Sequence, residues 1–169
     1  MFDAHPIETN LYQGNRYSVN NDPLLARQAL SLYRQALRNG VMARLLARIA
    51  GRARRLLDLN EVQSGLKVRS RHYAGVQAVP VQRIVGTEGR SHDFDVSFNP
   101  LSEKTSSRWL SIANARLQGI AMPAIELIQV GEVYFVRDGH HRISVARAFG
   151  EEAIDAQVTV WDVTGPIFY

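Results

Sequence analysis

The hydrophobic pattern of this chain changes along its length, from helical spacing at the start to strand-like alternation later on. Apolar residues recur every three or four positions between Leu24 and Leu57, which predicts amphipathic helices. Asp22-Pro23 is a typical helix start, because Asp can accept bonds from free amides and Pro fits the first helical position. Asn39-Gly40 is a typical stop. We therefore predict one helix from Asp22 to about Asn39 and a second from Val41 to Leu57.

After residue 65 the pattern predicts a mixture of strands and helices. Val76–Val85 alternates and is rich in β-branched residues, and Pro80 inside it indicates a sheet edge or an interruption. A helix is predicted from Thr105 or Ser106 to about Gln118, with Gly119 as its stop. Further strands are expected over 93–96, 124–130, 132–137 and 154–160, the middle two joined in a tight hairpin. Trp109, Phe135 and Trp161 are assigned to the core.

The segment from Val133 to Gly150 predicts a strand, a sharp turn and a helix that begins near His140. We expect Asp138 to cap this helix and Gly139 to let both the backbone turn and a ligand approach. A helix N-terminus has free amides and a partial positive charge, so it suits a phosphate. Arg142 and a histidine would assist, with His141 as the first candidate and His140 as the second, since the three side chains lie about 100° apart around the helix.

The alternative for this turn is an ordinary capped helix start with solvated histidines. We favour a phosphate site, because two histidines and an arginine in a first turn oppose the helix dipole. Adjacent histidines splay apart, so a histidine metal site is not expected.

A second group of candidate residues follows the strand that ends near Val85. In the loop Gly86–Arg90, Arg90 could neutralise phosphate and Glu88 could act as a general base together with Asp138. Asp93 and Asp95 would share one face of a strand and could hold Mg²⁺ beside a nucleotide phosphate. The alternatives are a common surface loop and a solvated sheet edge.

The N-terminal part of the chain is basic. Residues 1–72 contain 12 Lys and Arg against 5 Asp and Glu, and no acid lies between Leu24 and Leu57. A solvated helix face is the first interpretation of these arginines, a nucleic-acid backbone is the second, and an anionic membrane surface is the third, because interfacial Trp is lacking. Of the two partners, DNA is the one that we carry forward. No DNA-reading motif is present, so sequence-specific readout is not expected. On one predicted helix face the arginines fall at spacings of four, four and three: Arg44, Arg48, Arg52 and Arg55.

The segment from Val76 to Trp161 resembles the ParB/sulfiredoxin-like domain, often labelled ParB-like nuclease. The similarity lies in the proline before a strand, the hairpin, and the strand–Gly-x-x-Arg–helix turn, here Gly139-His140-His141-Arg142 with Ala146 behind it. Family members bind nucleotides: CTP in partition proteins, ATP in sulfiredoxins, and ADP or ATP in serine kinases with a similar turn. The resemblance implies a small α+β domain with a mixed sheet and a nucleotide di- or triphosphate, with Mg²⁺, at this turn.

Two departures from the family limit the implied function. Sulfiredoxins use a cysteine in this turn, and this chain has no cysteine, so their chemistry is excluded. The helix-turn-helix and dimerisation parts of partition proteins are not expected after the domain. We expect a nucleotide-binding module that associates with DNA; the alternative is a small-molecule kinase or other phosphotransferase. A two-metal nuclease ranks last, because the acids are too sparse.

The same sequence sets the expected organisation and compartment. We divide the chain into a helical, arginine-rich segment over residues 1–65 and the α+β domain over residues 66–169. No apolar run is long enough for a membrane span, and the N-terminus lacks the features of a signal peptide. With no cysteine either, the cytoplasm is the expected compartment.

Overall fold

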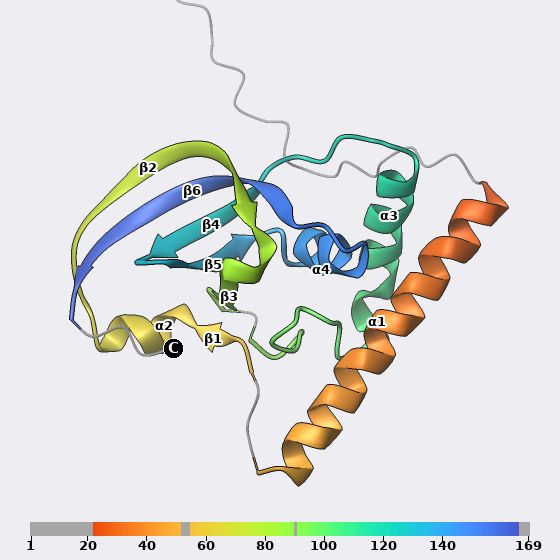
Figure 1. Ribbon diagram of the computed structural model, residues 1–169, viewed down its shortest axis with the longest axis horizontal. Helices are drawn as coiled ribbons and strands as arrows, with labels where there is room; N and C mark the ends of the chain where they lie inside the picture. The colour runs from red at the N-terminus through yellow and green to blue at the C-terminus, as the bar shows by residue number, and fades with distance from the viewer. Residues whose placement is uncertain (1–21, 52–54, 90, 166–169) are drawn as a thin grey trace, which may run out of the picture.

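The computed structural model describes residues 22–51, 55–89 and 91–165, which form helices stacked on a mixed sheet (Figure 1). Among the described helices, none combines the length and the apolar character needed to cross a bilayer. The elements are α1 (Pro23–Ile49), β1 (Leu57–Asp58), α2 (Leu59–Ser64), β2 (Lys67–Pro80), the 3-10 turn η1 (Val81–Arg83), β3 (Ile84–Thr87), the 3-10 turn η2 (Glu103–Thr105), α3 (Ser106–Leu117), β4 (Ile125–Val130), β5 (Val133–Asp138), α4 (His140–Ala148) and β6 (Ala153–Thr164).

The six strands lie in the order β1-β3-β5-β4-β6-β2. β1, β3 and β5 are parallel, β4 forms the predicted hairpin with β5, β6 is parallel to β4, and β2 is antiparallel to β6. Beside the sheet α4 comes first, then α3, then α1 (Figure 1). The predicted mixed α+β architecture is therefore confirmed, and Trp109, Phe135 and Trp161 are all buried as predicted.

Two predicted strands need correction. Val76–Val85 is not one strand, because β2 ends at Pro80 and β3 begins after the η1 turn. β2 is also the last strand of the sheet, so Pro80 marks both the interruption and the edge that it indicated. Residues 93–96 form turns, with a single bridge between Phe94 and Pro100 in place of a strand.

The two predicted N-terminal helices are also different in the structure. A single helix, α1, runs through Asn39-Gly40 to Ile49. Gly40 is buried where α1 meets the loop before η2, and a Cβ atom added to it would lie 2.7 Å from the carbonyl oxygen of Pro100. The glycine therefore serves close packing, not helix termination. The second predicted helix is wrong at its end as well, since Leu56 is in the core and Leu57 begins β1.

Gly40→Ala tests this packing role, because helix propensity and the close contact would change the free energy of unfolding in opposite directions. Alanine is normally about 1 kcal/mol better than glycine inside a helix. At Gly40 the contact with Pro100 outweighs that gain, and we expect the free energy of unfolding to fall by about 1–2 kcal/mol. The neighbouring Asn39→Ala is the control, because Asn39 is exposed and alanine should stabilise it slightly. Urea denaturation of both variants gives the comparison; stabilisation by Gly40→Ala would contradict the assignment.

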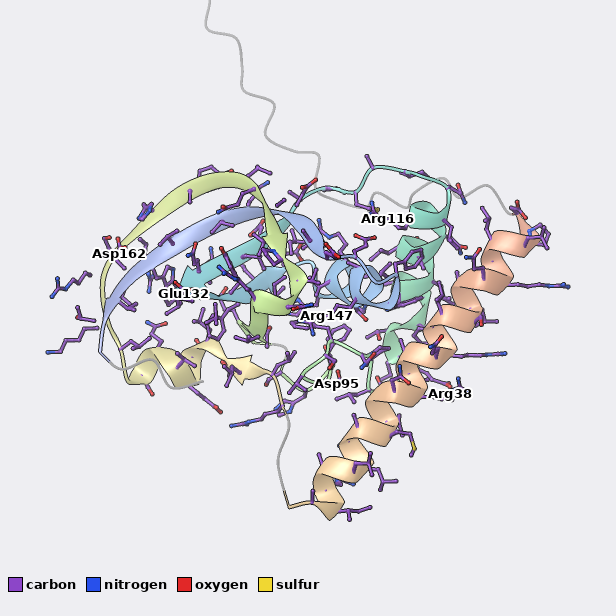
Figure 2. The ribbon with its side chains drawn as sticks, in the orientation of Figure 1. Arg38, Asp95, Arg116, Glu132, Arg147 and Asp162 are labelled. Carbon is purple, nitrogen blue, oxygen red and sulfur yellow. The ribbon has the colours of Figure 1, made fainter. Side chains whose placement is uncertain are left out.

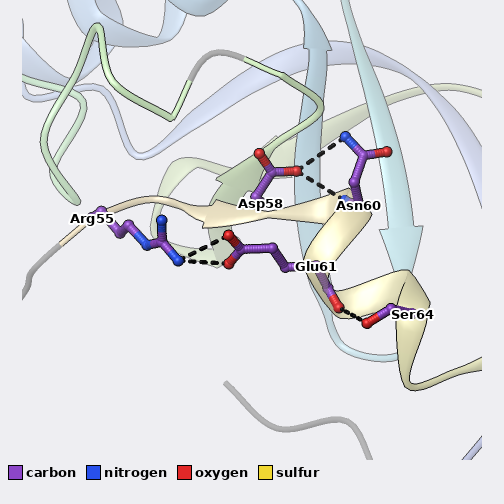
Figure 3. Close-up of polar contacts among 5 residues, drawn as sticks. All are labelled: Arg55, Asp58, Asn60, Glu61 and Ser64. Atoms are coloured by element: carbon purple, nitrogen blue, oxygen red, sulfur yellow. Dashed lines mark hydrogen bonds and ion pairs between the residues drawn. The ribbon is translucent and has the colours of Figure 1, made fainter.

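The sheet includes residues on the N-terminal side of the boundary predicted at residue 65. β1 pairs with β3, and Leu59 of α2 is buried against β4 and β5. Asp58 accepts hydrogen bonds from the backbone amide of Asn60 at 2.9 Å and from its side chain at 3.1 Å, which starts α2 (Figure 3). Arg55 binds both carboxylate oxygens of Glu61, at 2.9 and 2.7 Å (Figure 3). The α+β unit therefore begins about ten residues before the predicted boundary.

Candidate functional site at the carboxyl ends of β3 and β5

β3 and β5 are parallel neighbours, so the residues that follow them lie at one edge of the sheet. Thr87 is in register with Val136, and the Glu88 amide donates to the Val136 carbonyl at 2.8 Å. Ligands of open α/β sheets bind outside the carboxyl ends of parallel strands. The predicted turn at Gly139 and the predicted loop at Glu88 therefore meet at an edge suited to binding.

The turn between β5 and α4 requires glycine for two reasons. Gly139 has φ +103°, in the left-handed region that L side chains rarely adopt. A Cβ atom there would lie 2.4 Å from Cγ2 of Ile125. Gly139 itself is the N-cap of α4, and within the described structure no side chain caps this helix. The start of α4 thus lacks the cap that the sequence predicted.

Asp138 is not the N-cap, and this prediction is corrected. It is the last residue of β5, and its carboxylate accepts from Nη2 of Arg142, one helical turn ahead, at 2.6 Å. Nη1 of Arg142 donates to the carbonyls of Pro123 at 2.6 Å and Ala124 at 3.0 Å. Arg142 therefore fastens the segment before β4 to the turn, and these donors are already in use.

The two histidines are buried, not solvated. Each is 5% exposed, and Nε2 of His140 lies 2.6 Å from Oγ1 of Thr87. The ring of Phe94 stacks on His140 and meets His141 edge-on, with centroid separations of 6.2 and 5.3 Å. Sequence reasoning missed both Thr87 and Phe94, since nothing local links them to residues fifty positions away. The buried polar residues of the described structure come from the end of β3, the loop after it, and α4: Thr87, Ser91, Asp95, His140, His141 and Ser144.

The other site residues predicted near this edge are Glu88, Arg90, Asp93 and Asp95. Glu88, the predicted general base, accepts from Nε of Arg137 at 2.8 Å. Arg90 lies outside the described residues. The prediction of a Mg²⁺ site assumed that Asp93 and Asp95 share one face of a strand, but this segment is not a strand. Asp93 is exposed, whereas Asp95 is buried.

Asp95 holds its own loop together. Its carboxylate accepts from the amides of Ser97 and Asn99, each at 2.8 Å, and from the Asn99 side chain at 3.0 Å. Both oxygens therefore accept hydrogen bonds from the loop itself. In the described part of the chain, no group of three or more His, Asp or Glu side chains is placed to hold a metal ion. These residues do not fit the predicted Mg²⁺ site.

Arg147 of α4 connects several segments near this edge, and no pattern in the sequence indicated this role. Its Nη2 donates to the carbonyls of Val81 and Ile84 at 2.7 and 2.9 Å, and its guanidinium lies 5.0 Å from the ring centre of Phe98. Burial lowers the pKa of Arg147, and the nearby Asp95 carboxylate opposes that shift. Arg147 and Asp95 lie between the sheet and α1 (Figure 2), where Arg147 lines a cavity of about 1010 Å³. Arg147 thus joins α4 to the start of β3.

The predicted arginine stripe does not form as one row. Arg44 and Arg48 are exposed on α1, whereas Arg52 lies outside the described residues. Arg55 has left the helix and pairs with Glu61 at 2.7 Å. The prediction from the spacing of the four arginines was wrong, because α1 ends at Ile49, before Arg55.

No protein family and no characterised protein sequence matches this chain. Among solved structures, sulfiredoxin from Arabidopsis thaliana is similar, with 17% sequence identity and a TM-score of 0.38, over 49% of this chain and 82% of that one. A likeness at this level does not establish a family.

Proposed function

We propose that the edge formed by the ends of β3 and β5 binds the phosphates of a nucleotide at the N-terminus of α4. The main observation in support of this proposal is that α4 starts without a side-chain cap, although an aspartate immediately precedes Gly139. By contrast, Asp22 caps α1 and Asp58 caps α2. α3 also begins without a side-chain cap, but among the α-helices of the described residues only α4 combines this with His-His-Arg in its first turn, His140 to Arg142.

A phosphate at this position would accept hydrogen bonds from the first amides of α4 and interact with the positive end of its dipole. Thr87 contacts the imidazole of His140, and Phe94 packs against both imidazoles, so the two rings of this turn have fixed positions without a ligand. The family that the turn resembles suggests CTP, ATP and ADP as the nucleotides to test. Mg²⁺ would arrive bound to the phosphates, because the described residues include no group of three or more His, Asp or Glu side chains placed to hold it.

Binding fits this edge better than phosphoryl transfer does. Transfer requires a general base that can reach a substrate hydroxyl. Both candidates for the base are bonded to arginines, Glu88 to Arg137 and Asp138 to Arg142. The phosphotransferase alternative therefore has no observation in its favour.

Amide chemical shifts test the proposed site directly. We expect titration of CTP, ATP or ADP into the ¹⁵N-labelled protein to shift the amides of Gly139, His140 and His141 more than any others. Calorimetry on Arg137→Glu should show at least about tenfold weaker binding, because the variant places a negative charge at this edge. Arg69→Glu is the matched control, since Arg69 is exposed on β2 and lies outside this edge, and its affinity should equal that of the wild type. Shifts confined to other amides, or no binding of any of the three nucleotides, would contradict the proposal.

A further inference from the structure

The outward face of α1 changes character at Val41. The buried residues of the helix, Ala29, Tyr33, Ala36 and Gly40, all lie before this point and face α3 and the adjoining loop. After Gly40 no described residue of α1 is buried, and this part of the helix extends past α3 (Figure 1). Five large apolar side chains are instead 49–76% exposed: Val41, Met42, Leu45, Leu46 and Ile49.

Helix geometry places these apolar residues on the same side as the arginines of the first half. At 100° per residue, Arg27, Arg34 and Arg38 fall within about 80° of one another and of Val41, Leu45 and Ile49. Met42 and Leu46 lie on one flank of this side, and the exposed Arg48 lies on the other flank, about 20° from Val41. The buried face of α1 is on the opposite side of the helix. Figure 2 shows Arg38 on the side of α1 away from the sheet. We call this side, formed by the three arginines and the five apolar residues, the outer face of α1.

We propose that the outer face of α1 binds the surface of an anionic phospholipid bilayer. The helix would lie flat, with the five apolar side chains inserted among the acyl chains and Arg27, Arg34 and Arg38 against the headgroups. Arg44 and Arg48, which are exposed beside the apolar residues, would extend to the headgroups as well. The sheet, α3 and α4 are on the other side of the helix (Figure 1). No acid lies on α1, so nothing on the helix repels an anionic surface.

Charge complementarity favours a membrane over the other occupants. In an antiparallel pair of α1 helices, the arginines of one copy would face the apolar residues of the other, and in a parallel pair arginine would face arginine. Along DNA, the apolar half of the face would lie unpaired against phosphates. A bilayer interface accepts both halves at once, because it presents headgroups and hydrocarbon together.

Vesicle co-sedimentation of the full chain tests this proposal independently of nucleotide binding. We expect the protein to pellet with phosphatidylcholine–phosphatidylglycerol vesicles, weakly in high salt, and to stay in solution with phosphatidylcholine alone. Leu45→Gln with Ile49→Gln should abolish pelleting, and Arg34→Glu with Arg38→Glu should weaken it at least about tenfold. Val76→Gln is the control for the apolar change, since Val76 is 61% exposed on β2, and it should pellet like the wild type.

Three results would overturn the proposal. One is no pelleting, or equal pelleting with neutral vesicles. Another is a dimer in light scattering that Leu45→Gln with Ile49→Gln dissociates, which would assign the face to a second copy. The third is a duplex-DNA complex lost in the arginine variant while vesicle binding is absent. Thermal unfolding should be the same in all variants, because the replaced side chains are exposed.

Discussion

Replacing Gly139 by alanine is expected to lower the free energy of unfolding by about 4 kcal/mol, the largest effect that we predict for a single substitution. Two costs add at this position. The backbone angle, φ +103°, is strained for any residue with a side chain. The new methyl group would also meet Ile125, with 2.4 Å to Cγ2 and 2.8 Å to Cβ, and Ile125 is fully buried in β4. Ile125 therefore has little freedom to move away.

Gly150→Ala separates the two costs. Gly150 follows α4 with φ +72°, but nothing lies within 4 Å of the position that its Cβ would take. This variant introduces backbone strain alone, so we expect a loss of about 1 kcal/mol. Urea denaturation of both variants, analysed with a common slope, measures the difference. Equal losses would mean that the packing of Gly139 against Ile125 contributes nothing.

Replacing Arg142 by alanine is expected to cost about 3 kcal/mol of stability. The variant removes donors to the carbonyls of Pro123 and Ala124 and to the carboxylate of Asp138. The side chain of Arg142 is only 14% exposed, so water replaces these bonds poorly. Arg142→Lys should recover little, because a single ammonium group cannot span the carbonyls and the carboxylate as a planar guanidinium does.

The same measurement on Asp138→Ala shows which of these bonds matter. The Asp138 side chain is 59% exposed, so its loss should cost much less than the loss of Arg142. Arg108→Ala is the control for removing an arginine, since Arg108 is exposed on α3, and its stability should be nearly unchanged. If Asp138→Ala and Arg142→Ala destabilise equally, the ion pair and not the carbonyl bonds fixes the turn. Reduced nucleotide binding by Arg142→Ala would accordingly report damage to the turn before it reported a lost phosphate contact.

The sequence by itself predicted the elements whose signals are local. The hairpin of β4 and β5 follows from alternating residues around Gly131-Glu132, and α3 ends just before Gly119, which has φ +70°. The strand, glycine turn and helix from Val133 onward also form as predicted. In each case neighbours in the chain set the backbone conformation, so no distant contact is needed to predict it.

Only the tertiary structure decided what the polar side chains near the turn contact. Asp138 was predicted as a cap, but its carboxylate accepts a hydrogen bond from Arg142. The position of Arg142 in turn depends on its bond to a carbonyl nearly twenty residues earlier in the chain, that of Pro123. Asn39-Gly40 carried a stop signal that packing against Pro100 overrides. Backbone propensities are worth about 1 kcal/mol per residue and act locally. Burial and side-chain hydrogen bonds depend on which distant segments the sheet brings together, and at these positions they outweigh the local propensities.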